Sequence, residues 1–386
     1  MRFEFATATR ILFGPGTSSQ VASEAAAMGT HAMIVTGGTP ERIDHFLDSV
    51  SGAGLSAVPF SIPREPDVSL IEEGATTLRE EGCDIVIGIG GGSVIDAAKA
   101  IAAIGANNGE LTDYLEVIGK GKSLLQPSLP CIVLPTTAGT GAEVTKNAVI
   151  TSPERRVKVS LRSPYLLPRL SVIDPELTFT LPAETTAATG LDALTQCIEA
   201  YVSVRAQPLT DGFCLEGIKR ASRSLRRACT NGNDAAARED MAAASLLSGM
   251  ALTNAGLGAV HGFASPVGGI CGIAHGAVCA LLLPQVMEMN VAVLQKEQPQ
   301  APALDRYTTI ARICTGNPKA SAGDGVRWLH ELCRELPLPS ADRFGLSPDR
   351  YPEIVTATAK ASSMKGNPVL LTEMQLTHIL EETFMI

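Results

Sequence analysis

The sequence is poor in charged residues, which make up 18% of its 386 positions, against about 25% in an ordinary globular protein. With 45% hydrophobic residues the chain can bury a large core, which excludes disorder as its main state. Its length suits two domains of about 100 to 200 residues each. Lys and Arg number 31 against 40 Asp and Glu, and the resulting net charge of −9 disfavours nucleic acids and anionic membranes as partners.

Long apolar runs and paired cysteines are also missing. The longest strictly apolar run, residues 277–283, is much shorter than the roughly 18 residues that a membrane-spanning helix needs. The N-terminal residues show neither the apolar core nor the cleavage site of a secretory signal, so we expect a cytoplasmic protein. Nine cysteines without a C-x-x-C pair favour reduced thiols over a disulfide or zinc-finger framework.

The two halves of the chain differ in pattern. Up to about residue 180, short strand-like runs alternate with amphipathic stretches, as in βαβ units around a parallel sheet. Three predicted strands, 31–36, 84–89 and 131–134, end before loops rich in glycine or threonine, and such loops point to one ligand crevice. Beyond Leu181, helical spacing predicts a helical second half, with an exposed connection at 290–304.

The loop Gly90-Gly91-Gly92-Ser93 follows one of these strands and opens a predicted helix. Successive glycines let backbone N–H groups approach an anion, and a helix N-terminus adds partial positive charge, so the loop could hold a pyrophosphate. It matches neither G-x-G-x-x-G nor the P-loop motif, and alone it could equally be a tight turn without a ligand.

A second loop, 135–145, carries threonines whose hydroxyl groups can donate to phosphate or ribose oxygens. Taken alone, it could simply be a threonine-rich loop that caps the sheet. Together, the two loops favour a dinucleotide.

Candidate metal ligands lie in the helical half. Asp192 and Gln196 are four residues apart and share a helix face, although that segment alone favours Asp192 as a helix cap and Gln196 as a surface residue. His261 and His275 bracket a stretch that is unusually rich in small residues. Two histidines near an aspartate suit a catalytic Zn²⁺ or Fe²⁺, whereas a lone histidine is more often structural, so spacing leaves both interpretations open.

Five blocks of sequence identify a family. They are GGGSVIDAAKA at 90–100, PTTAGTGAEVT at 135–145, DPELT at 174–178, GLDALTQCIEAY at 190–201, and GLGAVH at 256–261 with AHG at 274–276. In these blocks the chain resembles the iron-containing (group III) alcohol dehydrogenases over nearly its whole length. The resemblance implies a dehydroquinate synthase-like fold: a Rossmann-like α/β domain (1–181), an all-helical domain (182–386) and a cleft between them. It also implies a homo-oligomer, a dimer or larger.

Position by position, the resemblance places Asp192, His261 and His275 on three of the family's four metal-ligand positions. The fourth, normally histidine, is Gln196, a poor ligand for Fe²⁺, whereas three protein ligands and an open position suit Zn²⁺, as in the related glycerol dehydrogenases. A family histidine associated with proton transfer is Ser265 here. The metal-free maleylacetate reductases typically replace the ligand Asp by Asn, so the carboxylate of Asp192 favours a divalent metal, Fe²⁺ or Zn²⁺.

For the cofactor, NAD(P)(H), the resemblance assigns the pyrophosphate to Gly91, Gly92 and Ser93, the crevice to Thr136, Thr137 and Thr140, and further contacts to Asp96, Lys158 and Leu177. Without it, Asp96 and Lys158 would be interpreted as solvated surface charges. The strand 31–36 ends on Gly37 and Gly38, where NAD-preferring relatives often carry an Asp. Because no carboxylate stands there to repel a 2′-phosphate and Arg42 could reach one, we expect NADP(H) to be preferred over NAD(H).

Three functions follow from these observations. The favoured one is a metal-dependent alcohol dehydrogenase or aldehyde reductase. The others are a metal-free reductase of a keto acid, in which Gln196 marks a lost site, and a non-catalytic metabolite-binding protein. The expected pocket walls, Val149, Phe263, Ser265 and Cys271, are small or apolar without an evident arginine clamp. They favour a small to medium neutral alcohol or aldehyde, and Arg162 is the residue that could overturn this preference. Cys197 and Cys271 are the cysteines expected close to the site.

Overall fold

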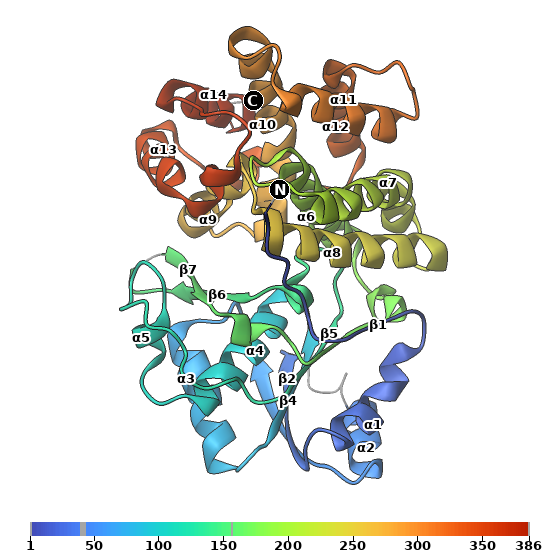
Figure 1. Ribbon diagram of the computed structural model, residues 1–386, viewed down its shortest axis with the longest axis vertical. Coiled ribbons are helices and arrows are strands. Elements are labelled where there is room, and N and C mark those ends of the chain that lie inside the picture. The colour runs from blue at the N-terminus through green and yellow to red at the C-terminus, as the bar shows by residue number, and fades with distance from the viewer. Residues whose placement is uncertain (1, 39–43, 156, 385–386) are drawn as a thin grey trace. The chain divides into compact units, whose positions relative to one another are not determined.

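The computed structural model describes residues 2–38, 44–155 and 157–384. The chain divides into two compact units (Figure 1). Each unit has its own clusters of buried hydrophobic residues. The sheet unit comprises Ala6–Thr137 and Gly141–Thr178. The helical unit comprises the residues up to Phe5, Ala138–Thr140 and everything from Phe179 on. The predicted combination of an α/β part and a helical part is confirmed, but segments 2–5 and 138–140 join the helical unit.

The sheet unit is built on a six-stranded parallel sheet in the order β1-β8-β5-β4-β2-β3. Its strands are β1 (Ile11–Phe13), β2 (His31–Gly37), β3 (Ser56–Ile62), β4 (Ile85–Gly90), β5 (Cys131–Pro135) and β8 (Leu170–Ile173). The predicted strands at 31–36, 84–89 and 131–134 correspond to β2, β4 and β5. A separate antiparallel hairpin is formed by β6 (Asn147–Ser152) and β7 (Val157–Arg162).

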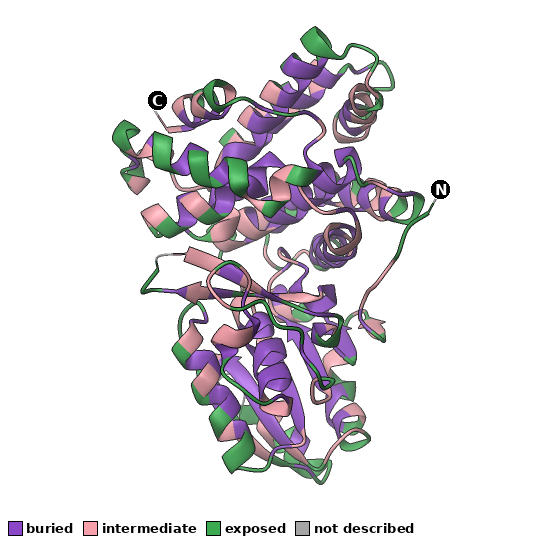
Figure 2. Ribbon diagram, turned by 60° about the vertical axis from the view of Figure 1, so that its left-hand side comes forward, coloured by how far each residue is buried: buried purple, intermediate pink, exposed green. Residues whose placement is uncertain are grey.

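Both faces of this sheet are covered, which explains why its central strands are almost continuously apolar. Successive side chains point to opposite faces. Met33 and Val35 pack with α3 (Val68–Glu80) and α4 (Gly92–Ala106), near the short α5 (Leu111–Tyr114). Ala32 and Ile34 pack with α1 (Val21–Ala26) and α2 (Asp44–Gly52). Figure 2 shows the central strands and α4 as largely buried.

The strand order reverses next to β2. The chain passes from β2 to β3 on one side and returns to β4 on the other. In open α/β sheets the crevice at such a reversal is where ligands bind, at the carboxyl ends of the strands. Here those ends are Gly37 of β2 and Gly90 of β4, and Pro135 of β5 pairs with Gly90.

The described part of the helical unit contains no strand. Its helices are α6 (Ala183–Val202), α7 (Pro208–Thr230), α8 (Ala235–Ala255), α9 (Ala259–Cys271), α10 (His275–Glu297), α11 (Pro302–Thr315), α12 (Ala322–Glu335), α13 (Tyr351–Lys360) and α14 (Glu373–Phe384). The exposed connection predicted for 290–304 is wrong, because α10 continues through most of it. Asn290 is 2% exposed, and its amide has hydrogen-bond partners in the core.

By length and mean hydropathy, α10 could cross a membrane, and α8 with α9 passes the same test as a pair bent by 101°. A count of strictly uninterrupted apolar residues does not detect helices that are apolar only on average. In the structure, 72% of the apolar window of α10 is buried inside the protein. That burial is what a core helix shows, so the length of α10 is weak evidence for a membrane span.

Candidate functional site

Four side chains of the helical unit converge on one point. They are Asp192 of α6, His261 of α9, and His275 and Cys279 of α10, and one ligand atom from each lies within 4.8 Å of the others. His261 Nε2 lies 3.3 Å from Asp192 Oδ1, and His275 Nε2 lies 3.8 Å from the same oxygen. Asp192 and His261 are buried, whereas the His275 side chain is 35% exposed, which leaves the cluster open on that side.

The burial of α6 decides how its polar residues behave. From Gly190 to Val202 every residue of the helix is buried, so a polar side chain there must find a partner or destabilise the fold. Asp192 lies in the middle of α6, and the interpretation as a helix cap is therefore wrong. Gln196 is 2% exposed rather than at the surface, and its Oε1 lies 2.6 Å from the Ser248 hydroxyl of α8.

Glu199, one turn beyond Gln196 on α6, orients His261. Its Oε2 lies 2.6 Å from His261 Nδ1, and its Oε1 accepts a hydrogen bond of 2.7 Å from the Val260 backbone N–H. With Nδ1–H donating to this carboxylate, loss of the second ring proton leaves the lone pair on Nε2, the nitrogen that lies 3.3 Å from Asp192 Oδ1. Carboxylates in this outer position typically fix the tautomer of metal-binding histidines.

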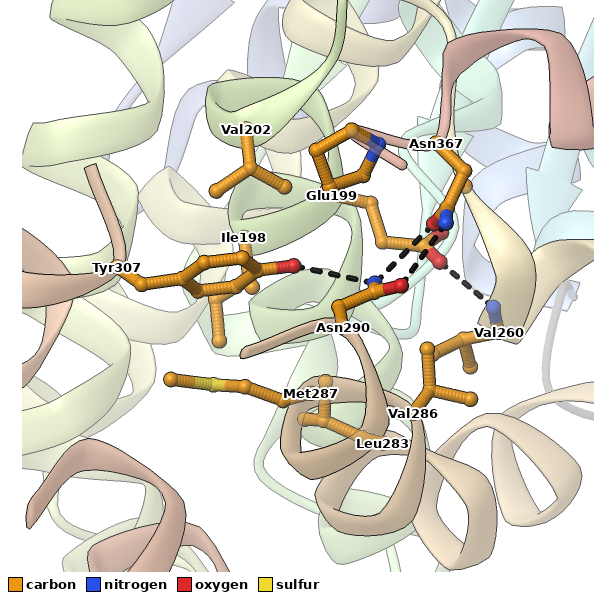
Figure 3. Close-up of a pocket in the computed structure, with 12 residues that line it drawn as sticks. Ile198, Glu199, Val202, Val260, Leu283, Val286, Met287, Asn290, Tyr307 and Asn367 are labelled. Atoms are coloured by element: carbon orange, nitrogen blue, oxygen red, sulfur yellow. Dashed lines mark hydrogen bonds between the residues drawn. The ribbon is translucent and has the colours of Figure 1, made fainter. Parts of the chain in front are cut away.

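Next to Glu199 lies a buried network of two asparagines and a tyrosine, Asn290, Asn367 and Tyr307 (Figure 3). Asn290 and Asn367 exchange amide hydrogen bonds of 2.9 and 3.2 Å, and Asn290 Nδ2 also lies 3.1 Å from the Tyr307 hydroxyl. Asn367 Oδ1 accepts from the Ala259 N–H at the start of α9. A Cβ atom at Gly258 would lie 2.8 Å from Asn367 Oδ1 and 2.9 Å from Glu199 Oε1, so only glycine lets both acceptors reach the start of this helix.

Ionisation within the cluster is coupled. Burial raises the pKa of Asp192, but His275 and His261 lower it by more, so it lies below its ordinary value. Burial lowers the pKa of His261, but Cys279 and Glu199 outweigh this and raise it well above its ordinary value. The pKa of His275 is raised too, because Cys279 and Asp192 outweigh burial. Protons therefore compete with a metal for these nitrogens, and metal binding should weaken as the pH falls.

Sequence reasoning missed Glu199 and Cys279. Cys279 lies in the apolar run 277–283, where a cysteine is normally a small core residue. Its spacing of four residues from His275 was the available signal, because i and i+4 side chains share a helix face. Cys197, expected near the site, is fully buried, and its Sγ would lie 2.5 Å from a Cβ atom at Gly217 of α7.

In the sheet unit, the two predicted loops lie side by side. Thr136 N–H donates a 2.9 Å hydrogen bond to Gly90 O, and a Cβ atom at Gly91 would lie 3.4 Å from the Thr137 methyl group. Gly91 is the N-cap of α4 and has no side chain to bond to the N–H groups of the first turn. Among the described residues no side chain caps the N–H groups of Gly92 and Ser93, which is the arrangement that the predicted pyrophosphate site requires.

The other predicted cofactor residues have varied surroundings. Asp96 accepts from Val149 N–H at 2.9 Å and pairs with Lys99, and Lys158 pairs with Glu65, so neither is a solvated surface charge.

Leu177 packs on the side of the sheet covered by α1 and α2. Thr140 belongs to the helical unit. Gly37 is the last residue of β2 and Gly38 follows it, but Arg42 lies outside the described residues.

The structure places two of the predicted pocket residues, Phe263 and Ser265, on α9. Phe263 is fully buried in the helical core and is not available to a substrate, so that prediction is wrong. Ser265, which stands at the position of the family's proton-transfer histidine, is exposed on α9.

Family models cover both units. One described as "Iron-containing alcohol dehydrogenase" matches residues 8–175, and one described as "Fe-containing alcohol dehydrogenase family, C-terminal" matches residues 186–384. The choline dehydrogenase of Bacillus subtilis (strain 168) is 34% identical over 390 residues, which cover 98% of this chain and 94% of that protein.

Solved structures show the same similarity. The crystal structure of a 1,3-propanediol oxidoreductase superposes with a TM-score of 0.92 at 32% identity, over 100% of both chains. Sulfoacetaldehyde reductase from Bifidobacterium kashiwanohense in complex with NAD⁺ superposes with a TM-score of 0.86 at 28% identity, over 99% of both chains.

Proposed function

Because the chain belongs to the iron-containing alcohol dehydrogenase family, we propose that it is a metal-dependent, NAD(P)-linked alcohol dehydrogenase or aldehyde reductase. The observation that carries the metal dependence is the convergence of Asp192, His261 and His275 from three helices. Members of this family use NAD(H) and a divalent metal such as Fe²⁺. The retained carboxylate and imidazoles support this proposal over a metal-free reductase or a binding protein.

The three side chains fit a small divalent cation. For bonds of about 2.0–2.1 Å to nitrogen and oxygen, neighbouring ligand atoms of a tetrahedral site are about 3.3–3.4 Å apart. The observed separations from Asp192 Oδ1 are 3.3 Å to His261 Nε2 and 3.8 Å to His275 Nε2. Shifts of a few tenths of an ångström would close the set around a cation.

The reaction moves a hydride from the alcohol carbon to the nicotinamide ring and a proton from the hydroxyl group to solvent, and its products are a carbonyl compound and NAD(P)H. A divalent metal bound at these residues supplies Lewis-acid polarisation of the substrate oxygen. Glu199 holds the His261 ring in place through a 2.6 Å contact with Nδ1. Ser265 has no group that titrates near neutral pH and can pass a proton only by exchanging hydrogen bonds.

We propose NADP(H) as the preferred cofactor and a small neutral alcohol or aldehyde as the substrate. β2 ends on Gly37 and Gly38 follows it, so neither of these two described residues carries a carboxylate that would repel a 2′-phosphate. The substrate class is supported by the similarity to a 1,3-propanediol oxidoreductase along the whole chain.

The test is to remove the metal and restore it. We expect the purified protein to contain about one metal ion per chain, to lose aldehyde reduction after dialysis against a chelator, and to regain it with Zn²⁺ or Fe²⁺. Asp192→Asn should abolish metal retention. Full activity in a chelator-treated, metal-free protein would instead support the metal-free reductase. Cofactor binding without turnover over a panel of aldehydes and ketones would support the binding protein.

A further inference from the structure

We propose that Cys279 is the fourth metal ligand of this site, in place of Gln196, and that the resulting set selects Zn²⁺ over Fe²⁺. The inference rests on the proposed function only because it requires a metal at this site. The set is then one carboxylate, two imidazoles and one thiolate: Asp192, His261, His275 and Cys279.

The sulfur atom of Cys279 lies at the distance that a shared metal would require. Its Sγ is 3.8 Å from His261 Nε2 and 3.7 Å from His275 Nε2. With a zinc–sulfur bond of about 2.3 Å and a zinc–nitrogen bond of about 2.0–2.1 Å, the sulfur–nitrogen edge of a tetrahedron is about 3.5–3.6 Å. Both contacts agree with that value to within about 0.3 Å. Both involve Nε2, the nitrogen through which each ring also approaches Asp192.

Helix α10 fixes the position of Cys279 relative to His275. His275 begins the helix and Cys279 follows one turn later, so both side chains lie on one face. Cys279 is fully buried, which keeps water from competing for its place beside the two rings. A ligand pair at i and i+4 on a helix is a common way to hold zinc.

Gln196 has a different partner. Its Oε1, the amide atom that could coordinate a metal, lies 2.6 Å from the Ser248 hydroxyl of α8. Both groups are buried, so moving the amide toward a metal would leave the hydroxyl with only the Ser245 carbonyl, 2.8 Å away. The chain thus lacks an imidazole on α6 but provides a sulfur atom on α10.

The chemistry of the donors sets the preference for the metal. Thiolate is a soft ligand that favours zinc, and zinc also binds nitrogen and oxygen donors more tightly than ferrous iron does. The thiol proton passes to solvent when the metal binds, and no oxidant or reductant is needed. Zinc sites can expand from four to five ligands during catalysis, which leaves room for a substrate oxygen.

The test is to replace the metal with Co²⁺ and record the absorption spectrum. We expect visible d–d bands, which report bound metal, and an intense sulfur-to-cobalt charge-transfer band in the near ultraviolet, which oxygen and nitrogen ligands do not give. In Cys279→Ser the charge-transfer band should disappear while the d–d bands remain. Cys229→Ser, which removes a half-buried thiol of α7 outside the cluster, is the matched control and should keep both.

Zinc affinity shows whether Cys279 or Gln196 is the metal ligand. Cys279→Ser should weaken zinc binding by roughly tenfold or more, and Gln196→Ala should leave it within about twofold. X-ray absorption of the wild-type zinc protein should show one sulfur at about 2.3 Å, a measurement that does not depend on how the variant folds. Two outcomes would overturn the assignment of Cys279 and leave the proposed metal dependence intact. One is a wild-type spectrum with d–d bands but no charge-transfer band, and the other is a charge-transfer band that remains in Cys279→Ser. A wild-type protein that binds no cobalt would also overturn the proposed metal dependence.

Discussion

Replacing Glu199 with glutamine tests how the site is held in place. In the wild type, the two carboxylate oxygens accept from different donors, Oε1 from the Val260 N–H and Oε2 from His261 Nδ1. Glutamine has the same shape but only one accepting oxygen. Either the Val260 N–H loses its acceptor, or the amide N–H faces His261 Nδ1 and favours the tautomer with its proton on Nε2.

The magnitude follows from the loss of one buried hydrogen bond to a charged group, which is worth about 1.5–3 kcal/mol. If the tautomer changes, the cost falls on metal binding, because Nε2 is the atom that faces Asp192. Since 1.4 kcal/mol corresponds to a factor of about ten, we expect Glu199→Gln to bind zinc about 10- to 100-fold more weakly. Loss of an outer carboxylate typically has an effect of this size.

The assay is competition for zinc against a chromogenic chelator, with the thermal midpoint of the chelator-treated protein measured in parallel. The matched control is Glu288→Gln, which removes a carboxylate that lies 3.2 Å from a surface histidine, His330, and should leave zinc affinity unchanged. A folded Glu199→Gln protein with zinc affinity within twofold of the wild type would refute the positioning role.

Three further predictions concern the cofactor, the sheet unit and the start of α9. Gly37→Asp should shift the ratio of catalytic efficiencies from NADPH toward NADH, because the new carboxylate would repel a 2′-phosphate. The added side chain has room, since no described atom lies within 4 Å of a Cβ at this position. An unchanged ratio would contradict this prediction. Burial raises the pKa of the Glu143 carboxyl from 4.5 to about 7. The native state therefore binds the extra proton, and stability falls as the pH rises between these values. Glu143→Gln should remove that fall and stabilise the protein at pH 8 by up to roughly 3 kcal/mol, and equal unfolding curves for the two proteins at pH 8 would count against it. Gly258→Ala should lower the thermal midpoint and zinc affinity together, because its Cβ would lie within 3 Å of Glu199 and Asn367; a variant with wild-type values for both would show that the contact relaxes without cost.

The sheet could be predicted from the sequence because its signals are local. β2, β4 and β5 are short apolar runs that end at glycine or proline, and both faces of a parallel sheet are buried. The connection at 290–304 was mispredicted for the opposite reason. Asn290 is polar in the sequence but buried in α10, where its amide pairs with Asn367 across 77 residues of chain. No local pattern reports a partner at that separation.

In the metal site, too, the residues depend on partners that are distant in the chain and leave no local signal. Asp192, His261 and His275 were found through a family resemblance, whereas the helix pattern alone favoured a cap for Asp192. α6 is buried on every side over its second half, so its polar residues leave no amphipathic signal. Their partners come from other helices, as with Glu199 and His261, 62 residues apart.

Cys279 shows most clearly what spacing can and cannot decide. Within α10 the spacing His275-x-x-x-Cys279 puts both side chains on one face, and the sequence alone predicts this. A cysteine among Ala, Val and Leu is nevertheless more often a core residue, and that interpretation holds unless metal-binding groups face it. His261 of α9 and Asp192 of α6 provide those groups only after three helices have packed. A donor missing from one helix can therefore be replaced from another, and the replacement becomes visible as a distance of 3.8 Å from His261 to a sulfur atom 18 residues away in the chain.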